Sequence, residues 1–300
     1  MPRVVAVVVH WRDPDATMAC VASLSGEDVG VVVVENGLDA PVGDRLARGA
    51  PHAVCVRSPE NRGYAGGANL GIAAARARGA EVVLLLNDDV RVQPGATAAA
   101  LRVLDADARV AAVGAKVVTR EDPGRLWLAW GEVTWRQSLV RLIGAGEPDG
   151  PRFARERDVT WIAGCAMWLR AAALEALGGL DEAFFAYHEE VEWCVRARAA
   201  GWRVVYCPAA VVSHTGRGGG APASVRIRKY FAARNSVLFA RRHGSAGQRL
   251  KLAAFLAASL PLELLWHLPR GDAEKVLLKI EGVRDGLLRR PPPLQALGLR

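Results

Sequence analysis

Hydrophobic residues in the first 120 positions occur in short unbroken runs that alternate with stretches of helical period. The runs are rich in Val and Leu and lie at Val4–Val9, Val31–Val34, Ala53–Val56, Val82–Leu86 and Val110–Val118. Apolar runs of this length predict strands that are buried on both faces. The intervening stretches predict helices at Ala16–Leu24, Val42–Arg48, Ala65–Arg78 and Gly95–Asp105. Strands that alternate with helices indicate an α/β domain with a mostly parallel sheet.

The pattern becomes irregular after residue 119, where prolines, glycines and tryptophans replace the helical period. This part predicts strands at Leu126–Trp130, Val133–Leu142 and Val159–Leu169, and helices at Ala171–Leu177 and Phe184–Ala200. Two short strands are expected at Val204–Cys207 and Val211–Ser213, before a glycine-rich loop at Gly216–Gly220. Aromatic rings suit both sugar stacking and core packing. Both roles stay open for the three tryptophans, Trp127, Trp130 and Trp135.

The sequence of the tail, residues 215–300, predicts helices, and the net positive charge of the chain lies in this tail. Val225–Arg242 has apolar residues at helical spacing, and Lys251–Leu268 is more apolar still. Residues 215–300 hold 16 Lys and Arg against 5 Asp and Glu, whereas the first 214 residues hold 23 and 26. Pro261 and Glu263 interrupt the apolar stretch, which favours a helix lying at an anionic membrane surface over one that spans it. A helical hairpin packed back on the body is the alternative.

These observations predict a catalytic or binding domain at residues 1–220 and a helical, basic region at residues 221–300. The five cysteines are widely spaced and form no CxxC pair, which indicates buried thiols in a reducing compartment. No Walker sequence occurs, and no G-x-G-x-x-G follows the first strand, so a P-loop NTPase or dehydrogenase is disfavoured. The tail lacks an aromatic platform for nucleic acid. We expect a cytoplasmic protein, peripheral on the inner face of the plasma membrane, without a nucleic-acid partner.

Two carboxylates follow the most apolar run, in the sequence Asn87-Asp88-Asp89. Ligands in open α/β sheets bind beyond the carboxyl ends of such strands. Carboxylate oxygens there can hold a hard divalent cation such as Mg²⁺ or Mn²⁺. Alternatively, Asp88 or Asp89 caps the helix that begins near Pro94.

Three further motifs carry polar or glycine residues at the ends of predicted elements. The glycine-dense stretch Glu60–Gly71 suits backbone contact with a ligand, but a tight loop-to-helix turn explains it as well. Glu189, Glu190 and Glu192 begin a helix, where acidic residues favour the macrodipole or supply a general base. His214 follows the last strand and is either a structural histidine or a ligand of metal or phosphate.

The order of these motifs resembles the family 2 inverting glycosyltransferases of GT-A fold, and among them the bacterial rhamnosyltransferase-like branch. The resemblance covers residues 3–240 and rests on Glu35-Asn36, Asn61-x-Gly-Tyr-x-Gly-Gly-x-Asn69, Asn87-Asp88-Asp89, Gly178-Gly179-Leu180-Asp181-Glu182, Phe185–Glu192 and His214. It implies a GT-A fold, a nucleotide-diphosphate sugar donor, a divalent metal, and a single displacement that inverts the anomeric carbon.

The resemblance also implies roles for individual positions. Asp89 and His214 match ligands of the metal and diphosphate, and Glu190, with Glu189 beside it, matches the catalytic base. We assign donor binding to His10, Glu35, Asn36, Asn61, Gly63, Asn69, Asn87 and Asp88. Glu35 and Glu190 stand where the family has Asp, so each carboxylate reaches one methylene further. Arg12 stands where an Asn often follows the first strand.

The resulting hypothesis is a metal-assisted inverting glycosyltransferase that moves a sugar, most simply a rhamnose-like one, to a saccharide or lipid-linked acceptor in bacterial polysaccharide or cell-wall biosynthesis. A sugar-phosphate nucleotidyltransferase is the alternative enzyme. It would need a glycine-rich, basic loop after the first strand, and the sequence there is His10-Trp11-Arg12-Asp13-Pro14. A non-catalytic sugar-binding or membrane scaffold protein is the alternative outside enzymes.

Overall fold

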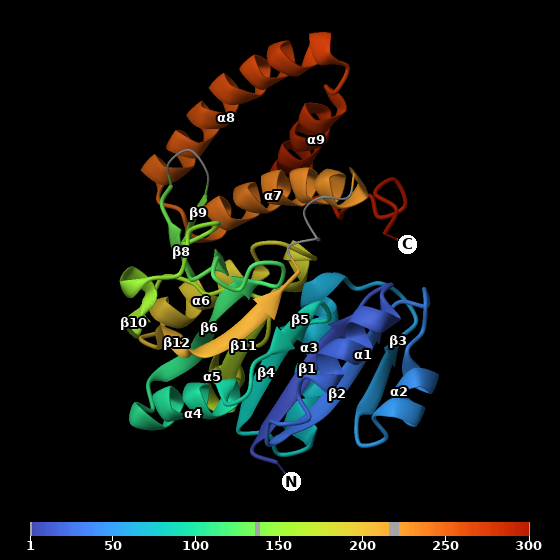
Figure 1. Ribbon diagram of the computed structural model, residues 1–300. Coiled ribbons are helices and arrows are strands. Elements are labelled where there is room, and N and C mark those ends of the chain that lie inside the picture. The colour runs from blue at the N-terminus through green and yellow to red at the C-terminus, as the bar shows by residue number, and fades with distance from the viewer. Residues whose placement is uncertain (1, 136–138, 216–221, 300) are drawn as a thin grey trace. The chain divides into compact units, whose positions relative to one another are not determined.

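The computed structural model describes residues 2–135, 139–215 and 222–299. Within these residues, ten strands form one sheet in the order β10-β12-β6-β11-β4-β1-β2-β3, with β5 beside β12 and β7 beside β6 (Figure 1). The strands are β1 (Val4–His10), β2 (Val29–Asn36), β3 (Val54–Ser58), β4 (Val82–Asn87), β5 (Val90–Val92), β6 (Val110–Thr119), β7 (Leu126–Leu128), β10 (Arg157–Asp158), β11 (Ala166–Arg170) and β12 (Arg203–His214). A second sheet pairs β8 (Trp130–Val133) with β9 (Val140–Ile143).

The large sheet is mostly parallel, as the alternating pattern predicts. Strand β1 lies between β2 and β4 and is parallel to both, and β6 is parallel to β12. Strand β11 runs antiparallel between β4 and β6. The helices of this part are α1 (Pro14–Ala22), α2 (Gly43–Gly49), α3 (Gly63–Ala77), α4 (Ala96–Ala106), α5 (Ala171–Leu177) and α6 (Glu189–Ala199), with 3₁₀ turns at Pro151–Phe153 and Glu182–Phe184.

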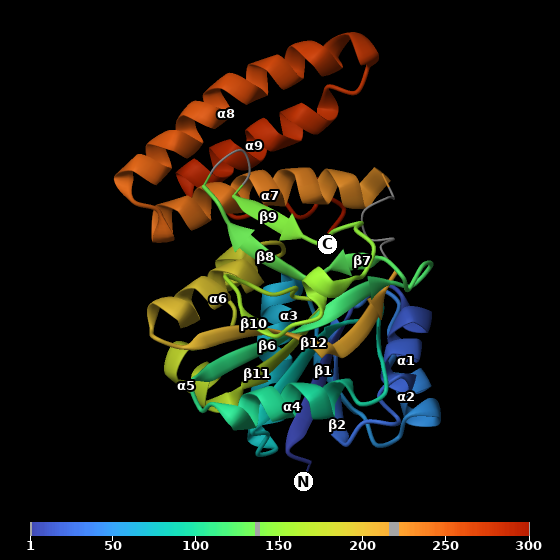
Figure 2. The ribbon, with the colours of Figure 1, turned by 60° about the vertical axis from the view of Figure 1, so that its left-hand side comes forward.

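Helices cover both faces of the sheet (Figure 2). Side chains alternate along β1, so Val7 and Val9 face α3 whereas His10 faces α1, where it bonds to Thr17. Helix α3 lies flush on the sheet because of its glycines. A Cβ at Gly71 would lie 2.1 Å from Cγ1 of Val7. Close packing therefore explains much of the glycine-dense stretch.

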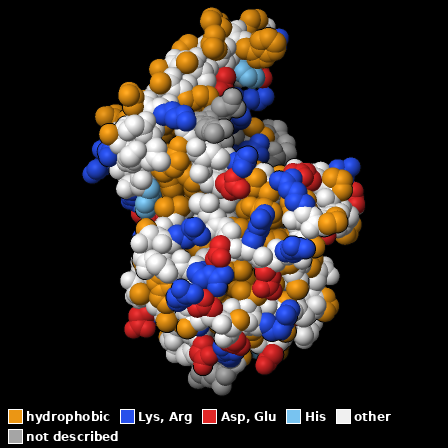
Figure 3. Space-filling view, turned by 90° about the vertical axis from the view of Figure 1, so that its left-hand side faces the viewer, with side chains coloured by type: hydrophobic (Ala, Val, Ile, Leu, Met, Phe, Trp, Pro, Cys, Tyr) orange, Lys and Arg blue, Asp and Glu red, His pale blue; other side chains and the backbone are white. Residues whose placement is uncertain are grey.

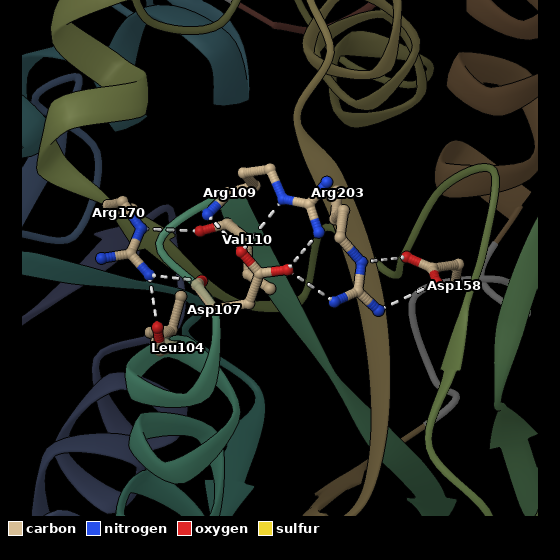
Figure 4. A network of polar contacts seen from close by, with 7 residues as sticks. All are labelled: Leu104, Asp107, Arg109, Val110, Asp158, Arg170 and Arg203. Carbon is tan, nitrogen blue, oxygen red and sulfur yellow. Dashed lines mark hydrogen bonds and ion pairs between the residues drawn. The ribbon is translucent and has the colours of Figure 1, made fainter.

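The edge of the sheet at which β4 begins is held by arginines (Figure 4). Arg170, at the end of β11, donates to the carbonyls of Val110 at 2.7 Å and Asp107 at 3.2 Å. Arg203 forms ion pairs with Asp107 at 3.0 Å and Asp158 at 2.9 Å. These contacts join the α4–β6 turn to β10, β11 and β12, and they lie at the edge opposite to the carboxyl ends of β1, β2 and β4.

Several predicted elements have different bounds in the structure. The expected helix Phe184–Ala200 begins only at Glu189, because Phe185, Tyr187 and His188 have positive φ. The expected strand Val159–Leu169 reduces to Ala166–Arg170, since apolar composition there reflects burial rather than strand conformation. Val204–Cys207 and Val211–Ser213 belong to one strand, β12, with a register shift where Pro208 lacks an N–H.

The expected strand Val133–Leu142 is also wrong, because β8 ends at Val133 and β9 begins at Val140. Residues 136–138, within that stretch, lie outside the described residues, as does the predicted loop Gly216–Gly220. Strand β5 was not predicted. Its three residues follow Asp88-Asp89 directly and pair antiparallel with β12.

Contacts along the chain define two compact units. The sheet unit comprises Met1–Glu132, Leu142–Phe185 and Glu190–Gly216, and the helical unit comprises Val133–Arg141, Ala186–Glu189 and Arg217–Arg300. The helical unit contains α7 (Pro222–His243), α8 (Ala246–His267), a 3₁₀ turn at Leu268–Arg270, and α9 (Glu274–Leu288). Helices α7 and α8 cover the stretches Val225–Arg242 and Lys251–Leu268, in which helices were expected, and α9 was not predicted.

Candidate active site

The carboxyl ends of three parallel strands bring several predicted residues to one edge of the sheet. In β1, Val9 pairs with Asn87 of β4, and His10 pairs with Glu35 of β2. The register follows from the apolar runs, since a slip by one residue would move each buried set of side chains to the other face. The edge is therefore built by sequence segments that are about 25 to 50 residues apart.

Glu35 holds the start of helix α2. Its side chain is buried, and one oxygen accepts hydrogen bonds from the backbone N–H groups of Val42 and Gly43, both at 2.7 Å. The other oxygen pairs with Arg57 at 2.8 Å. The longer Glu side chain reaches the helix N-terminus, where a carboxylate is favoured. Its predicted contact with the donor stays a prediction.

Asn36 orders the loop that precedes α3. Its buried amide donates to the Gly63 carbonyl at 2.9 Å and to Asn61 Oδ1 at 3.2 Å, and its oxygen accepts from the Arg62 N–H at 2.9 Å. Asn61 in turn accepts from the Gly63 N–H at 2.9 Å. Three of the predicted donor-binding residues, Asn36, Asn61 and Gly63, thus form one connected group.

Asn69 and His10 also bond within the protein. Asn69 exchanges two hydrogen bonds with the backbone of Leu180, at 2.8 and 2.9 Å, and so ties α3 to the Gly178–Glu182 motif. His10 is 2% exposed, and its ring nitrogens lie 2.6 Å from Thr17 Oγ1 and 2.8 Å from the Ala40 carbonyl. Both residues position loops at the candidate site, and their contact with a donor remains a prediction.

Asp88 and Asp89 form the turn between β4 and β5 and do not cap a helix. Helix α4 begins at Ala96, and the carboxylate of Glu27 accepts from the N–H groups of Gly95 at 2.6 Å and Thr97 at 2.8 Å. The capping alternative is therefore wrong. The acidic turn has no structural role at that helix.

Asp89 and His214 meet, as the resemblance implies. The register Val90–His214 between β5 and β12 brings the histidine to the acidic turn, where its Nε2 lies 3.2 Å from Asp89 Oδ1. The other oxygen of Asp89 accepts from the Thr215 hydroxyl at 3.0 Å. Burial raises the pKa of Asp89, but hydrogen bonds from His214 and Thr215 lower it by more, so the carboxyl stays ionised.

Asp88 has a different environment from Asp89. Its carboxylate accepts from the Trp11 N–H at 3.1 Å. Burial, reinforced by the negative charges of Asp89 and Asp13, raises the pKa of Asp88 to about 7. Asp88 is therefore only partly ionised near neutral pH, whereas Asp89 keeps its charge and is the better suited of the two to a cation.

Asp89 and His214 provide two ligand atoms of types that bind divalent cations. Among the residues that the structure describes, no group of three or more His, Cys, Asp or Glu side chains converges as a metal site. A two-ligand arrangement fits a cation of the Mg²⁺ or Mn²⁺ type, because such ions commonly take few protein ligands and complete their shell with phosphate oxygens and water. The residues present therefore fit the implied metal.

Glu190 lies at the same edge of the sheet. A Cβ at Gly164 would be 3.2 Å from Cβ and Cγ of Glu190. The next residue, Cys165, accepts at its carbonyl from the Asn87 N–H at 3.1 Å. The segment 164–165 therefore connects Glu190 to the strand that ends in the acidic turn. Glu189, the other half of the predicted pair, is buried.

Two further aromatic residues help to build this edge. Trp127, for which sugar stacking and core packing both stayed open, places its ring 4.4 Å from that of His214. Tyr64, which sequence reasoning did not single out, donates its hydroxyl to the Gly164 carbonyl at 2.8 Å. Of the other tryptophans, Trp130 is buried against Phe153 and Tyr206. Trp127 alone of the three lies beside a predicted metal ligand, and no local pattern distinguishes it from the others.

Comparison with known proteins identifies the family. Residues 2–241 match the family described as glycosyltransferase like family 2. The chain belongs to this family. N-acetylglucosaminyl-diphospho-decaprenol L-rhamnosyltransferase of Mycobacterium tuberculosis is 29% identical over 227 residues, which cover 66% of this chain and 70% of that protein. Pre-mycofactocin glycosyltransferase of the same species is 29% identical over 219 residues, 72% of this chain and 43% of that protein.

Solved structures agree with the fold of this family 2 glycosyltransferase. A mannosyltransferase from Pyrobaculum calidifontis, in complex with GDP-Man and Mn²⁺, has a TM-score of 0.59 at 19% identity and covers 95% of this chain and 87% of its own. GalNAc-T7 with UDP, GalNAc and Mn²⁺ has a TM-score of 0.57 at 14% identity, covering 85% and 54%. The GT-A fold expected from the motifs is confirmed, and the chain is a glycosyltransferase.

Proposed function

We propose that this glycosyltransferase transfers a sugar with inversion from a nucleoside-diphosphate donor, and that Glu190 is the general base. The observation that carries the proposal is the placement of Glu190 against Gly164, next to the strand that ends in Asn87-Asp88-Asp89. An inverting displacement needs a base on the acceptor side and a stabilised diphosphate on the leaving side. Glu190 would supply the base, and the Asp89–His214 pair would help to stabilise the diphosphate.

Asp89 and His214 would hold a divalent metal in this proposal. When bound, that ion acts as a Lewis acid that neutralises charge on the departing diphosphate. The lowered pKa of Asp89 keeps its carboxylate charged, and Thr215 fixes its second oxygen. Mn²⁺ in the solved structures of the mannosyltransferase and GalNAc-T7 supports the same choice of cofactor.

The acceptor hydroxyl would lose its proton to Glu190. The connected group of Asn36, Asn61 and Gly63 lies at the end of β2, which β1 separates from the strand that leads into the acidic turn, and it supports donor binding at this edge. The name of the Mycobacterium tuberculosis relative gives rhamnose as its sugar and a decaprenol-linked saccharide as its acceptor. We therefore propose a rhamnose-like sugar and a saccharide or lipid-linked acceptor for this chain.

A lipid-linked acceptor agrees with the surface of helix α8. Among the described residues, one helix, Ala246–Arg270, is long and apolar enough to cross a membrane, and none of it is buried. Its outward residues include Leu250, Leu262, Leu265, Trp266 and Leu268, each more than 60% exposed, and Figure 3 shows apolar side chains along this helix. We propose that α8 lies in the interface of an anionic membrane at the cytoplasmic face, where cell-wall or polysaccharide precursors are extended.

The enzymatic proposal is tested by donor turnover and by product stereochemistry. Purified protein with Mn²⁺ is screened against dTDP-, UDP- and GDP-sugars, and the anomeric configuration of the product is read by NMR. Asp89→Asn and Glu190→Gln should each lower kcat by about 10²–10⁴-fold, the range for loss of a base or charge stabiliser. Glu175→Gln, at an exposed carboxylate on α5, is the matched control. Retained anomeric configuration, or near-normal turnover by Glu190→Gln, would refute the base assignment.

A further inference from the structure

The segment that leads into helix α6 has an unusual backbone. Phe185, Tyr187 and His188 have φ values of 65°, 68° and 71°. Residues with a Cβ seldom adopt this left-handed region, because the Cβ crowds the neighbouring carbonyl oxygen. Such conformations persist only where surrounding groups hold them, and they concentrate at functional sites. A group that holds this segment in its left-handed conformation can therefore affect function.

Asn235 of helix α7 is that group. Its side chain is completely buried, and its Nδ2 donates to the carbonyls of Ala186 at 2.8 Å and Tyr187 at 2.6 Å. Both carbonyl oxygens therefore lie on one side of the chain, within reach of a single nitrogen. All three residues belong to the helical unit.

The orientation of the Asn235 amide is itself fixed. Its Oδ1 accepts from the guanidinium of Arg234 at 3.0 Å, which leaves the nitrogen for the two carbonyls. Arg234 is also buried and donates to the carbonyl of Arg290, just beyond α9, at 3.0 Å. The contact to the left-handed segment thus rests on a connected polar network within the helical unit.

The chain passes from this segment directly into the proposed base. Tyr187 and His188 are followed by Glu189, the first residue of α6, and then by Glu190. The dihedral angles of Tyr187 and His188 set the direction in which the first turn of α6 starts. They therefore set how the chain enters α6 just before Glu190, and small displacements of a catalytic group cost large factors in rate.

We infer that Asn235 is a positioning residue for transfer, which holds the left-handed segment so that α6 presents Glu190 correctly. This inference rests on the proposed role of Glu190 as the base. A residue that only stabilised α7 would not need two N–H donors aimed at consecutive carbonyls. A buried amide is costly unless its hydrogen bonds are made, and here they are made to the segment that precedes the base.

The first test compares Asn235→Asp with wild type and with Ser236→Ala. The Asp variant keeps the size of the side chain but removes both donors, whereas Ser236 is the next residue on α7 and donates its hydroxyl to the Ala232 carbonyl within the same helix. We expect Asn235→Asp to lower kcat by about 10- to 100-fold with donor Kd unchanged, and to shift the acidic limb of the kcat–pH profile. Ser236→Ala should stay within about twofold of wild type. Equal kcat in both variants, or parallel changes in kcat and donor Kd, would overturn the inference.

A second variant keeps the test decisive if Asn235→Asp folds poorly. Glycine takes positive φ without a side-chain penalty, so adding His188→Gly should restore thermal stability. We expect kcat of the double variant to stay low, because nothing then fixes the two carbonyls. Recovery of kcat together with stability would show that Asn235 contributes only to folding. Wild-type protein without any transferase activity would instead refute the proposed function, so the two failures are distinguishable.

Discussion

At the residue scale, a glycine sets the space available to the proposed base. A methyl group at Gly164 would lie 3.2 Å from two side-chain carbons of Glu190, which is closer than ordinary van der Waals contact. We predict that Gly164→Ala displaces Glu190 by a few tenths of an ångström and lowers kcat by about tenfold, with the free energy of unfolding changed by less than about 1 kcal/mol. Steady-state kinetics and urea unfolding measure the two effects.

The matched control for this glycine is Gly26. A Cβ at Gly26 would meet no atom within 4 Å, so Gly26→Ala should leave kcat at the wild-type value. If Gly164→Ala also kept full activity, Glu190 would not need its present position, and the base assignment would lose its geometric support.

The buried imidazole of His188 predicts that the stability of the protein depends on pH. Burial lowers the pKa of His188 to about 4, against an ordinary value of about 6.5. Between these values the unfolded chain binds a proton that the native state excludes, so stability contributed at neutral pH is lost as pH falls from about 6.5 toward 4. From pH 7 to pH 5 this one group should remove about 2 kcal/mol.

The measurement compares wild type with His188→Asn in urea at both pH values. Asn tolerates the left-handed φ of this position and does not titrate. Its unfolding free energy should fall by about 2 kcal/mol less than that of wild type over the interval, since the other groups titrate in both proteins. Equal losses of unfolding free energy in the two proteins would show that the His188 imidazole is protonated in the native state at pH 5.

Which residues meet at the candidate site was only partly predictable. The motif order indicated Asp89 and His214, and the structure brings them within 3.2 Å. It also indicated Glu35 and Asn69, which bond to Val42 and Leu180. Such partners lie in other segments of the chain, and the residue types of a motif do not reveal whether a polar group faces a ligand or the protein.

At the element scale, prediction succeeded where one physical signal dominated. Strands β1, β2 and β4 are largely buried on both faces, so their apolar runs gave bounds within two residues. It failed where backbone conformation departs from composition. The residues before Glu189 are aromatic and helix-compatible in pattern, yet their positive φ values stop the helix. Helix α9 was missed because its exposed apolar residues blur the period, as Leu277, Leu287 and Leu288 show.

Helix α9 packs on α7 through two glycines four residues apart. A Cβ at Gly282 would lie 2.4 Å from the Tyr230 carbonyl, and one at Gly286 would lie 2.6 Å from that of Arg234. We predict that Gly282→Leu lowers the free energy of unfolding by about 2–4 kcal/mol, because it separates the helices and disturbs the Tyr230–Asp285 hydrogen bond of 2.9 Å. Urea unfolding followed by circular dichroism measures it.

The control for this packing is a glycine in the same unit with open space around it. A Cβ at Gly247, in the first turn of α8, would meet no atom within 4 Å, so Gly247→Leu should change stability by less than about 1 kcal/mol. A comparable loss in both variants would mean that bulk at any helix of this unit is harmful, and that the α7–α9 contact is not specific.

At the scale of the whole molecule, the α/β architecture followed from the alternation of strands and helices, and the family followed from the order of its motifs. The composition shift near residue 215 indicated a separate basic region. It did not indicate that residues 133–141 and 186–189 belong to the helical unit, because those short segments join it through contacts rather than through sequence continuity. Chain order alone therefore leaves the boundary of a compact unit undetermined.

The helical unit contains α8, for which we predict binding to lipid. Glu263 of α8 pairs with Lys279 of α9, whereas the neighbouring Leu262, Leu265 and Trp266 are exposed. We predict that Leu262→Ser with Leu265→Ser weakens binding to phosphatidylglycerol vesicles by about 10- to 100-fold, because each leucine contributes on the order of 1 kcal/mol or more when buried in the interface. Leu277→Ser with Leu288→Ser, on the exposed face of α9, is the matched control.

Vesicle co-sedimentation at low and high salt measures the binding of both variants, and salt should weaken the wild-type binding since the unit is basic. Unchanged binding by the α8 variant would assign its apolar face to another partner, and sedimentation velocity would then show whether that partner is a second copy of the chain.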